Sequence, residues 1–389
     1  MKLRIGASLT GLVVLLAACG QAQSDARPAA KASPVSSAAA TPAASPQTGP
    51  AVATETKEFR DWTAVCNNGN DCYAFGFAPD YGAGWVRIFM PAGPNAEPQV
   101  AFGLWSEDFY KGASTGKGPP PLSLVIDGRV FPGVIAGASD EDAPVGEIRT
   151  GVRGLISALA AGRALEIRAG ETQAISISGS SAALLWIDER QGRLGTTTAL
   201  LRRGDRPASS VPPAATLPLV QAAPVADQTG FGEKQPLPAP LRAVPSVAAC
   251  LEETADNEWL RDDVMSARLD ARTELWAVPC GAGAYNVSHQ WYVTGPGGRD
   301  PRPAELLGSG GPRTGDAAEV WPANSTINGG YAANARAIVA FSKGRGIGDC
   351  GTSQTWVWTG RRFELELEDS MGHCAGVAPD YWPTTWRTR

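Results

Sequence analysis

Histidine is scarce in this sequence, with only 2 His among 389 residues. So few imidazoles leave little material for a histidine-built metal site or for a catalytic triad. Strong charge of one sign is also lacking, because 39 Asp and Glu face 34 Lys and Arg and the net charge is −5. A nucleic-acid-binding protein usually presents a basic face, so we expect no nucleic-acid partner. With so few histidines we also expect no metal site. The sequence shows no coherent catalytic constellation and no cofactor motif, so we expect no cofactor, name no catalytic residue and lean against an enzyme.

The N-terminal apolar run, Ile5–Ala18, is too short to span a membrane. A helix needs about 20 apolar residues to cross a bilayer, and this run is shorter. Lys2 and Arg4 precede it and small residues follow, which is the pattern of an export signal. The sequence therefore predicts a signal peptide over residues 1–18.

The end of this run, Leu16-Ala17-Ala18-Cys19, resembles the lipobox of bacterial lipoproteins. In that family the chain is cut before the cysteine, which then carries a lipid. The resemblance implies a membrane anchor on Cys19, and Gly20 in place of Asp favours the outer membrane. The alternative is an ordinary export signal with a chance cysteine. Residues 20–56 consist mostly of Ala, Pro, Ser and Thr, so we expect residues 19–56 to form a lipidated, disordered tether.

Six cysteines remain after Cys19, and an even number in an exported chain indicates disulfides. No C-x-x-C motif occurs, which argues against zinc and against thioredoxin-like redox chemistry. Six cysteines allow fifteen connectivities, and the sequence alone does not choose among them. Spacing across two hairpin candidates favours three pairs: Cys66 with Cys72, Cys350 with Cys374, and Cys250 with Cys280.

Proline divides the rest of the chain, since residues 206–245 contain nine. Proline removes a backbone donor and fixes φ, so this linker is expected to be extended and largely unpaired, although it could wrap along a domain surface. Residues 57–205 alternate as strands with two short helical patterns, and residues 246–389 form a Trp-rich strand pattern. The sequence predicts a mainly β (α+β) fold of two disulfide-stapled domains.

Several segments resemble a known family. They are Phe59–Cys66 with Cys72–Ala74, Leu275–Cys280 with Gly283–Asn286, Lys343–Gly351, Trp356–Gly360, Cys374–Gly376 and Trp382–Trp386. Together they resemble an uncharacterised bacterial envelope family catalogued as domain of unknown function 1176. The first domain also resembles the invasion-associated locus B proteins, which are exported and disulfide-bearing. The resemblance implies a protein that faces the periplasm, and it brings no established reaction or catalytic residue.

Two short motifs imitate known sites. Gly112–Gly116 matches the G-x-S-x-G of hydrolases, but that chemistry needs a helix after the serine, and Pro119–Pro121 forbid one. We expect a loop. Asp140–Asp142 with Glu147 could attract Ca²⁺, but the ligand order of an EF-hand is absent, which favours a solvated acidic loop.

A thiol–imidazole pair is the remaining nucleophile candidate. His373 adjoins Cys374, and Cys350 lies in a glycine-rich segment. In an oxidising compartment these two cysteines would bridge each other, and a bridged sulfur is no nucleophile. We expect His373 and His289 to be ordinary structural or surface residues.

Tryptophan is abundant, with 12 residues in the chain. Trp356 and Trp358 are two apart in a strand pattern and so face one side. With Trp291 they are either core or an aromatic face for a sugar or a protein pocket. We expect a non-catalytic envelope protein that binds an envelope protein or glycan. The alternatives are a cell-wall or glycan hydrolase that uses carboxylates, and an inhibitor of an envelope-attacking enzyme.

Overall fold

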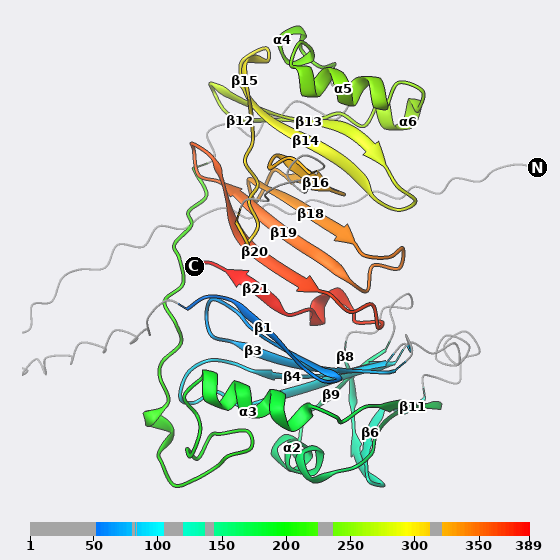
Figure 1. Cartoon of the computed structure of the whole chain (residues 1–389). Helices are drawn as coiled ribbons and strands as arrows, with labels where there is room; N and C mark the ends of the chain where they lie inside the picture. Colours follow the sequence, from blue (N-terminus) through cyan, green and yellow to red (C-terminus); the bar gives the residue numbers. More distant parts are fainter. Residues whose placement is uncertain are drawn as a thin grey trace, which may run out of the picture. The chain divides into compact units, whose positions relative to one another are not determined.

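The computed structural model describes residues 52–79, 82, 84–104, 120–136, 144–224, 236–311 and 321–389. Residues Gln47–Arg389 form one unit by their contacts. Within the described residues this unit is built on four antiparallel sheets with short helices (Figure 1). The mainly β fold is therefore confirmed. No helix in the described ranges is long and apolar enough to cross a membrane.

Seven strands form the first sheet, in the order β1-β2-β3-β4-β5-β9-β8. Their bounds are β1 (Glu55–Phe59), β2 (Trp62–Cys66), β3 (Cys72–Phe77), β4 (Gly84–Met90), β5 (Gln99–Leu104), β9 (Val145–Ile148) and β8 (Val134–Ala136). A second sheet has the order β11-β10-β6-β7. Its strands are β11 (Glu171–Ile175), β10 (Leu165–Ala169), β6 (Ser123–Ile126) and β7 (Arg129–Pro132).

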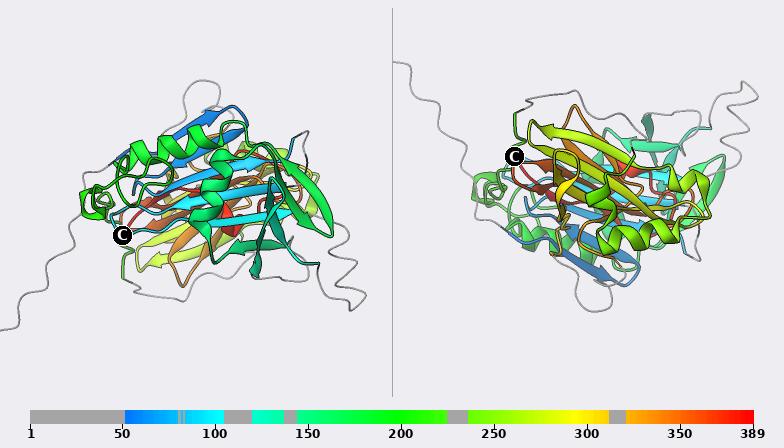
Figure 2. Two further views of the ribbon diagram at one scale, coloured as in Figure 1. Left: turned by 90° about the horizontal axis from the view of Figure 1, so that it is seen from below. Right: turned by 90° about the horizontal axis from the view of Figure 1, so that it is seen from above.

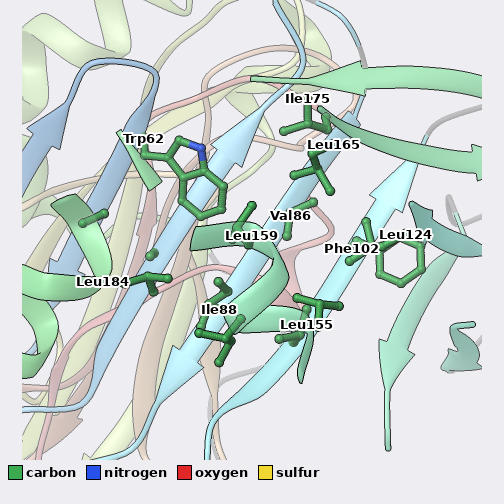
Figure 3. Packing of buried hydrophobic residues seen from close by; sticks show 14 of the residues in the cluster. Trp62, Val86, Ile88, Phe102, Leu124, Leu155, Leu159, Leu165, Ile175 and Leu184 are labelled. Carbon is green, nitrogen blue, oxygen red and sulfur yellow. The ribbon is translucent and has the colours of Figure 1, made fainter. Parts of the chain in front are cut away.

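Two helices cover one face of the seven-stranded sheet: α2 (Val152–Ala161) and α3 (Ser180–Arg190), as Figure 2 shows on the left. Leu155 and Leu159 of α2 are buried, as their helical spacing predicts. They pack against sheet residues such as Ile88 and Phe102 in one apolar cluster (Figure 3). The two short helices expected in the first domain are confirmed.

Two further five-stranded sheets follow toward the C-terminus. One contains β12 (Met265–Asp270), β13 (Thr273–Ala282), β14 (Val287–Gly295), β15 (Arg299–Pro303) and β16 (Ser325–Ile327). The other contains β17 (Gly330–Ala332), β18 (Ala337–Lys343), β19 (Gly351–Trp358), β20 (Phe363–Met371) and β21 (Thr384–Arg387). Three helices precede β12 in the chain: α5 (Pro245–Glu253) and α6 (Glu258–Arg261) lie against β13, and α4 (Ala239–Arg242) lies against β15 (Figure 1).

The three disulfides are the pairs that spacing favours. Cys66 and Cys72 face each other across the β2–β3 hairpin, with Cα atoms 4.1 Å apart. Cys250–Cys280 fastens α5 to β13, and Cys350–Cys374 joins the segments that flank the β19–β20 hairpin. Each disulfide therefore joins two segments that are neighbours in the fold.

The proline-rich segment runs along the strands in its described part, and several of its backbone groups are paired. The N–H of Ala215 donates to Gly69 O (3.3 Å), and the N–H of Ala223 donates to Trp358 O (2.7 Å). Arg389 N–H donates to Pro218 O at 2.9 Å. The expectation of a largely unpaired linker is wrong for these residues, because their backbone groups pair with a hairpin turn, the end of β19 and the C-terminal residue.

The second face of the seven-stranded sheet is also covered. Phe75 and Trp85 lie in one buried cluster with Met371, Val377 and Trp382. The Trp85 indole N–H donates to Gly376 O at 3.0 Å. Residues on both sides of the proline-rich segment thus share an apolar interior. The division into two domains at residues 206–245 stays a prediction.

Candidate binding site

The three tryptophans proposed for binding lie in the interior. Trp291, Trp356 and Trp358 are 0%, 2% and 2% exposed and belong to one apolar cluster. The indole N–H of Trp291 donates to Thr326 Oγ1 at 2.8 Å, and that of Trp356 donates to Leu307 O at 2.9 Å. The idea of an exposed aromatic face on these residues is corrected, because their strand positions point inward and they form core.

The two histidines have structural surroundings. His289 is buried, and its Nε2 lies 3.1 Å from an Asp263 carboxylate oxygen. His373 is exposed, and its ring stacks on Phe77 with centroids 4.4 Å apart. The neighbouring Cys374 is bonded to Cys350, so no thiolate is available to His373.

Five carboxylates are buried in the described part of the chain, and each accepts hydrogen bonds from loop backbone. They are Asp71, Asp188, Glu274, Asp349 and Glu368. Carboxylates committed to backbone donors fix loops, and these five line none of the cavities described below. No cluster of three potential metal ligands occurs in the described ranges. These residues give no acid–base pair in a cleft.

Asp188 shows this structural role most clearly. From α3 it accepts the N–H groups of Leu200 (2.7 Å), Leu201 (2.9 Å) and Arg202 (3.3 Å). Burial raises the pKa of this carboxyl, and the three backbone bonds oppose the rise. The carboxylate therefore closes the turn after α3.

Two motif candidates of the sequence, Gly112–Gly116 and Asp140–Asp142, lie outside the described residues, as does Cys19. Glu147, once grouped with the acidic loop, lies in β9 and pairs with Arg149 at 3.3 Å. Glu147 is thus paired with an arginine that directly follows its strand.

An open groove lies where β15 meets the β19–β20 hairpin. Its basic end is a cavity of about 360 Å³, lined by Arg302, Arg361 and Arg362 beside Trp358 and Phe363. The Trp358 indole nitrogen is buried without a hydrogen-bond partner. We call this cavity, together with the adjoining apolar cavity described next, the arginine–tryptophan groove.

The apolar end of the groove is a cavity of about 380 Å³ that shares Glu305, Arg362 and Phe363 with the basic end. Leu219, Leu307 and Trp386 line it. Leu219 is 58% exposed and Leu307 is 37% exposed. Exposed apolar side chains gathered in one hollow are typical of a contact surface.

The charges of the groove are only partly compensated. All three arginines are exposed, and Arg362 pairs with Glu364 at 2.9 Å. Among the described residues, no carboxylate lies within ion-pair distance of Arg302 or Arg361. Free guanidinium groups offer paired donors that fit a carboxylate or phosphate.

The wall of the groove is held by buried polar groups. Glu368 accepts the N–H of Ser309 at 3.1 Å and the side-chain amide of Gln354 at 2.6 Å. The indole N–H of Trp356, also in β19, donates to Leu307 O. The loop that carries Leu307 is therefore fixed by β19 and β20. Sequence reasoning missed this groove, and only its two tryptophans, 358 and 386, gave a signal.

These features define a three-disulfide β protein with an open, partly basic groove. A family model described as "Protein of unknown function (DUF1176)" matches residues 56–389, so the chain belongs to that family. It is 30% identical over 362 residues to the uncharacterized protein YpfG of Escherichia coli (strain K12), covering 87% of this chain and 94% of that one. The crystal structure of invasion associated protein B from Bartonella henselae is similar at 14% identity and a TM-score of 0.27, covering 36% of this chain and 99% of that one.

Proposed function

We propose that this protein is a lipid-anchored, non-catalytic binding protein of the bacterial envelope, facing the periplasm or the cell surface. The N-terminal sequence supports export and a lipid on Cys19. Three disulfides support the same compartment, because such bonds persist outside the reducing cytosol. The tether predicted over residues 19–56 ends earlier than expected, because Glu55 and Thr56 belong to β1. The part before β1 would hold the folded unit away from an anchor in the outer membrane.

The arginine–tryptophan groove is the observation that carries the binding proposal. It combines Arg302 and Arg361, for which the described residues supply no carboxylate at ion-pair distance, with exposed leucines in one continuous hollow. An apolar centre with arginines at its side is the composition of a binding hot spot. The five buried carboxylates of the described residues bind backbone donors, so they do not support the alternative of a hydrolase that uses paired carboxylates.

The test uses the exported chain with Cys19→Ser, immobilised and exposed to solubilised envelope material. The groove variant is Arg302→Gln with Arg361→Gln, and the control variant is Arg168→Gln with Arg272→Gln, two exposed arginines outside the groove. We expect a protein or glycan that the parent and the control retain and the groove variant loses. An envelope-attacking enzyme among the retained proteins would indicate inhibition. Equal retention by all three chains, or none by any, would contradict a binding role for the groove.

The anchor is tested separately by fractionation. The parent chain should sediment with the outer membrane, and the Cys19→Ser chain should not. Recovery of both chains in the same soluble fraction would contradict the lipid anchor.

A further inference from the structure

A second site, separate from the groove, lies on the face of the seven-stranded sheet that is turned away from α2 and α3. Arg87 of β4 is opposite Ala101 of β5, which is opposite Glu147 of β9. Neighbouring strands are about 4.8 Å apart, so a cation and an anion stand roughly 10 Å apart across two strand spacings. Ala101 lies between them in this row, and the Tyr381 ring contacts the Arg87 guanidinium while its hydroxyl bonds Glu147. The space is a cavity of about 270 Å³, also lined by Gln99 and Arg149.

The guanidinium of Arg87 is enclosed by aromatic rings. It lies 4.7 Å from the ring centre of Tyr381, 5.8 Å from that of Phe89 and 6.0 Å from that of Tyr73. Its Nη1 donates to Tyr381 O at 3.2 Å. Aromatic faces stabilise a cation but supply no hydrogen-bond acceptor in the plane of the guanidinium.

Arg87 also lacks a counter-ion. Its Nε is buried with no hydrogen-bond partner, and no described carboxylate is within ion-pair distance. Burial lowers the pKa of Arg87, and the neighbouring Tyr73, Tyr381 and Glu147 oppose this. A half-buried cation without an anion is costly to maintain, which makes it a candidate for a bound anionic group.

The acidic end of the row is held in place by Tyr381. The Tyr381 hydroxyl donates to Glu147 Oε1 at 3.1 Å, and Arg149 donates to the other oxygen at 3.3 Å. Burial, together with Glu147, raises the pKa of Tyr381 to about 12, so this hydroxyl stays a donor at neutral pH. A carboxylate has about four acceptor positions, which leaves Glu147 free to accept from a ligand.

We propose that this cavity binds a small zwitterion, with its carboxylate on Arg87 and its ammonium group on Glu147. The chemistry is that of a free α-amino acid or of a very short peptide with both ends charged. The cavity of about 270 Å³ is slightly smaller than the pockets of about 300 Å³ or more that hold drug-sized molecules, and an amino acid or very short peptide is smaller than such a molecule. Arg87 and Glu147 come from the sheet and Tyr381 from the C-terminal segment, so the ligand would sit where these two parts meet.

The test is calorimetric titration of the whole protein at neutral pH and low salt. The probes are L-alanine and L-alanyl-L-alanine, matched with propionate and ethylamine, which each carry one of the two charges. We expect one of the zwitterions to bind, and both single-charge probes to bind at least tenfold more weakly. Which zwitterion binds distinguishes the amino acid from the peptide.

Variants then locate the binding. Glu147→Gln and Arg87→Gln should each weaken the zwitterion at least tenfold, whereas Arg168→Gln on β10 should leave it unchanged. Because Arg87→Gln removes contacts with Tyr381, its thermal unfolding is measured to check that it folds. If the Arg87→Gln chain is unfolded, the affinity of the Glu147→Gln chain tests the proposal instead. The proposal is overturned if neither zwitterion binds, if propionate binds as tightly as the zwitterion, or if the folded Glu147→Gln chain keeps full affinity. These results are independent of the groove experiment.

Discussion

Replacement of Asp188 by alanine is a strong test of the view that the buried carboxylates serve the fold. The change leaves the backbone N–H groups of Leu200, Leu201 and Arg202 without their acceptor. A hydrogen bond contributes about 1 kcal/mol on average and more when the acceptor is charged, so three bonds suggest roughly 3–5 kcal/mol. Burial raises the pKa of Asp188, so the cost of desolvating the carboxylate offsets part of the stabilisation that these hydrogen bonds supply. We expect a net loss of about 3 kcal/mol.

The assay is equilibrium unfolding in urea, followed by far-ultraviolet circular dichroism. The matched control is Glu189→Ala, which removes an exposed carboxylate from the next position of α3. This control should change the free energy of unfolding by less than about 0.5 kcal/mol. A loss below about 1 kcal/mol for Asp188→Ala, or one equal to the control, would refute the reasoning.

Two further predictions concern stability. Removing the Cys250–Cys280 bond with a double serine substitution should cost about 3.5 kcal/mol, because that bond closes a loop of 30 residues in the unfolded chain; an unchanged urea midpoint would contradict this. Burial tends to raise the pKa of Asp349, but the Arg345 side chain and the Gly376 N–H outweigh burial and hold that pKa below 3.8. This contribution is present above the unfolded pKa and is lost as the pH falls through the lower folded pKa, so Asp349→Asn should flatten the acid side of stability measured against pH. If the dependence of stability on pH is the same in the Asp349→Asn chain, the Arg345–Asp349 pair does not contribute to stability.

Local features of this fold could be predicted from the sequence. Cys66 and Cys72 flank a turn, so the chain itself brings them opposite each other. The helix at Val152–Ala161 followed from apolar residues at helical spacing, because one face had to be buried. In both cases the information lies within a few residues of the feature.

The candidate sites could not be predicted, because they depend on distant pairings. The groove joins Leu219, Arg302 and Arg361, which lie in three separate segments. The zwitterion site requires the β4-β5-β9 strand order and the return of Tyr381 to that sheet. Tryptophan gave a partial signal: Trp358 does line the groove, but as buried support and not as an exposed contact.

The lipid proposed on Cys19 and the three disulfides can be checked in one measurement, mass mapping of the protein extracted from membranes and digested without reduction. We expect an N-terminal peptide that begins at an acylated Cys19, together with linked peptides for 66–72, 250–280 and 350–374. An unmodified Cys19 in the mature chain, or free thiols at the other six cysteines, would contradict this expectation.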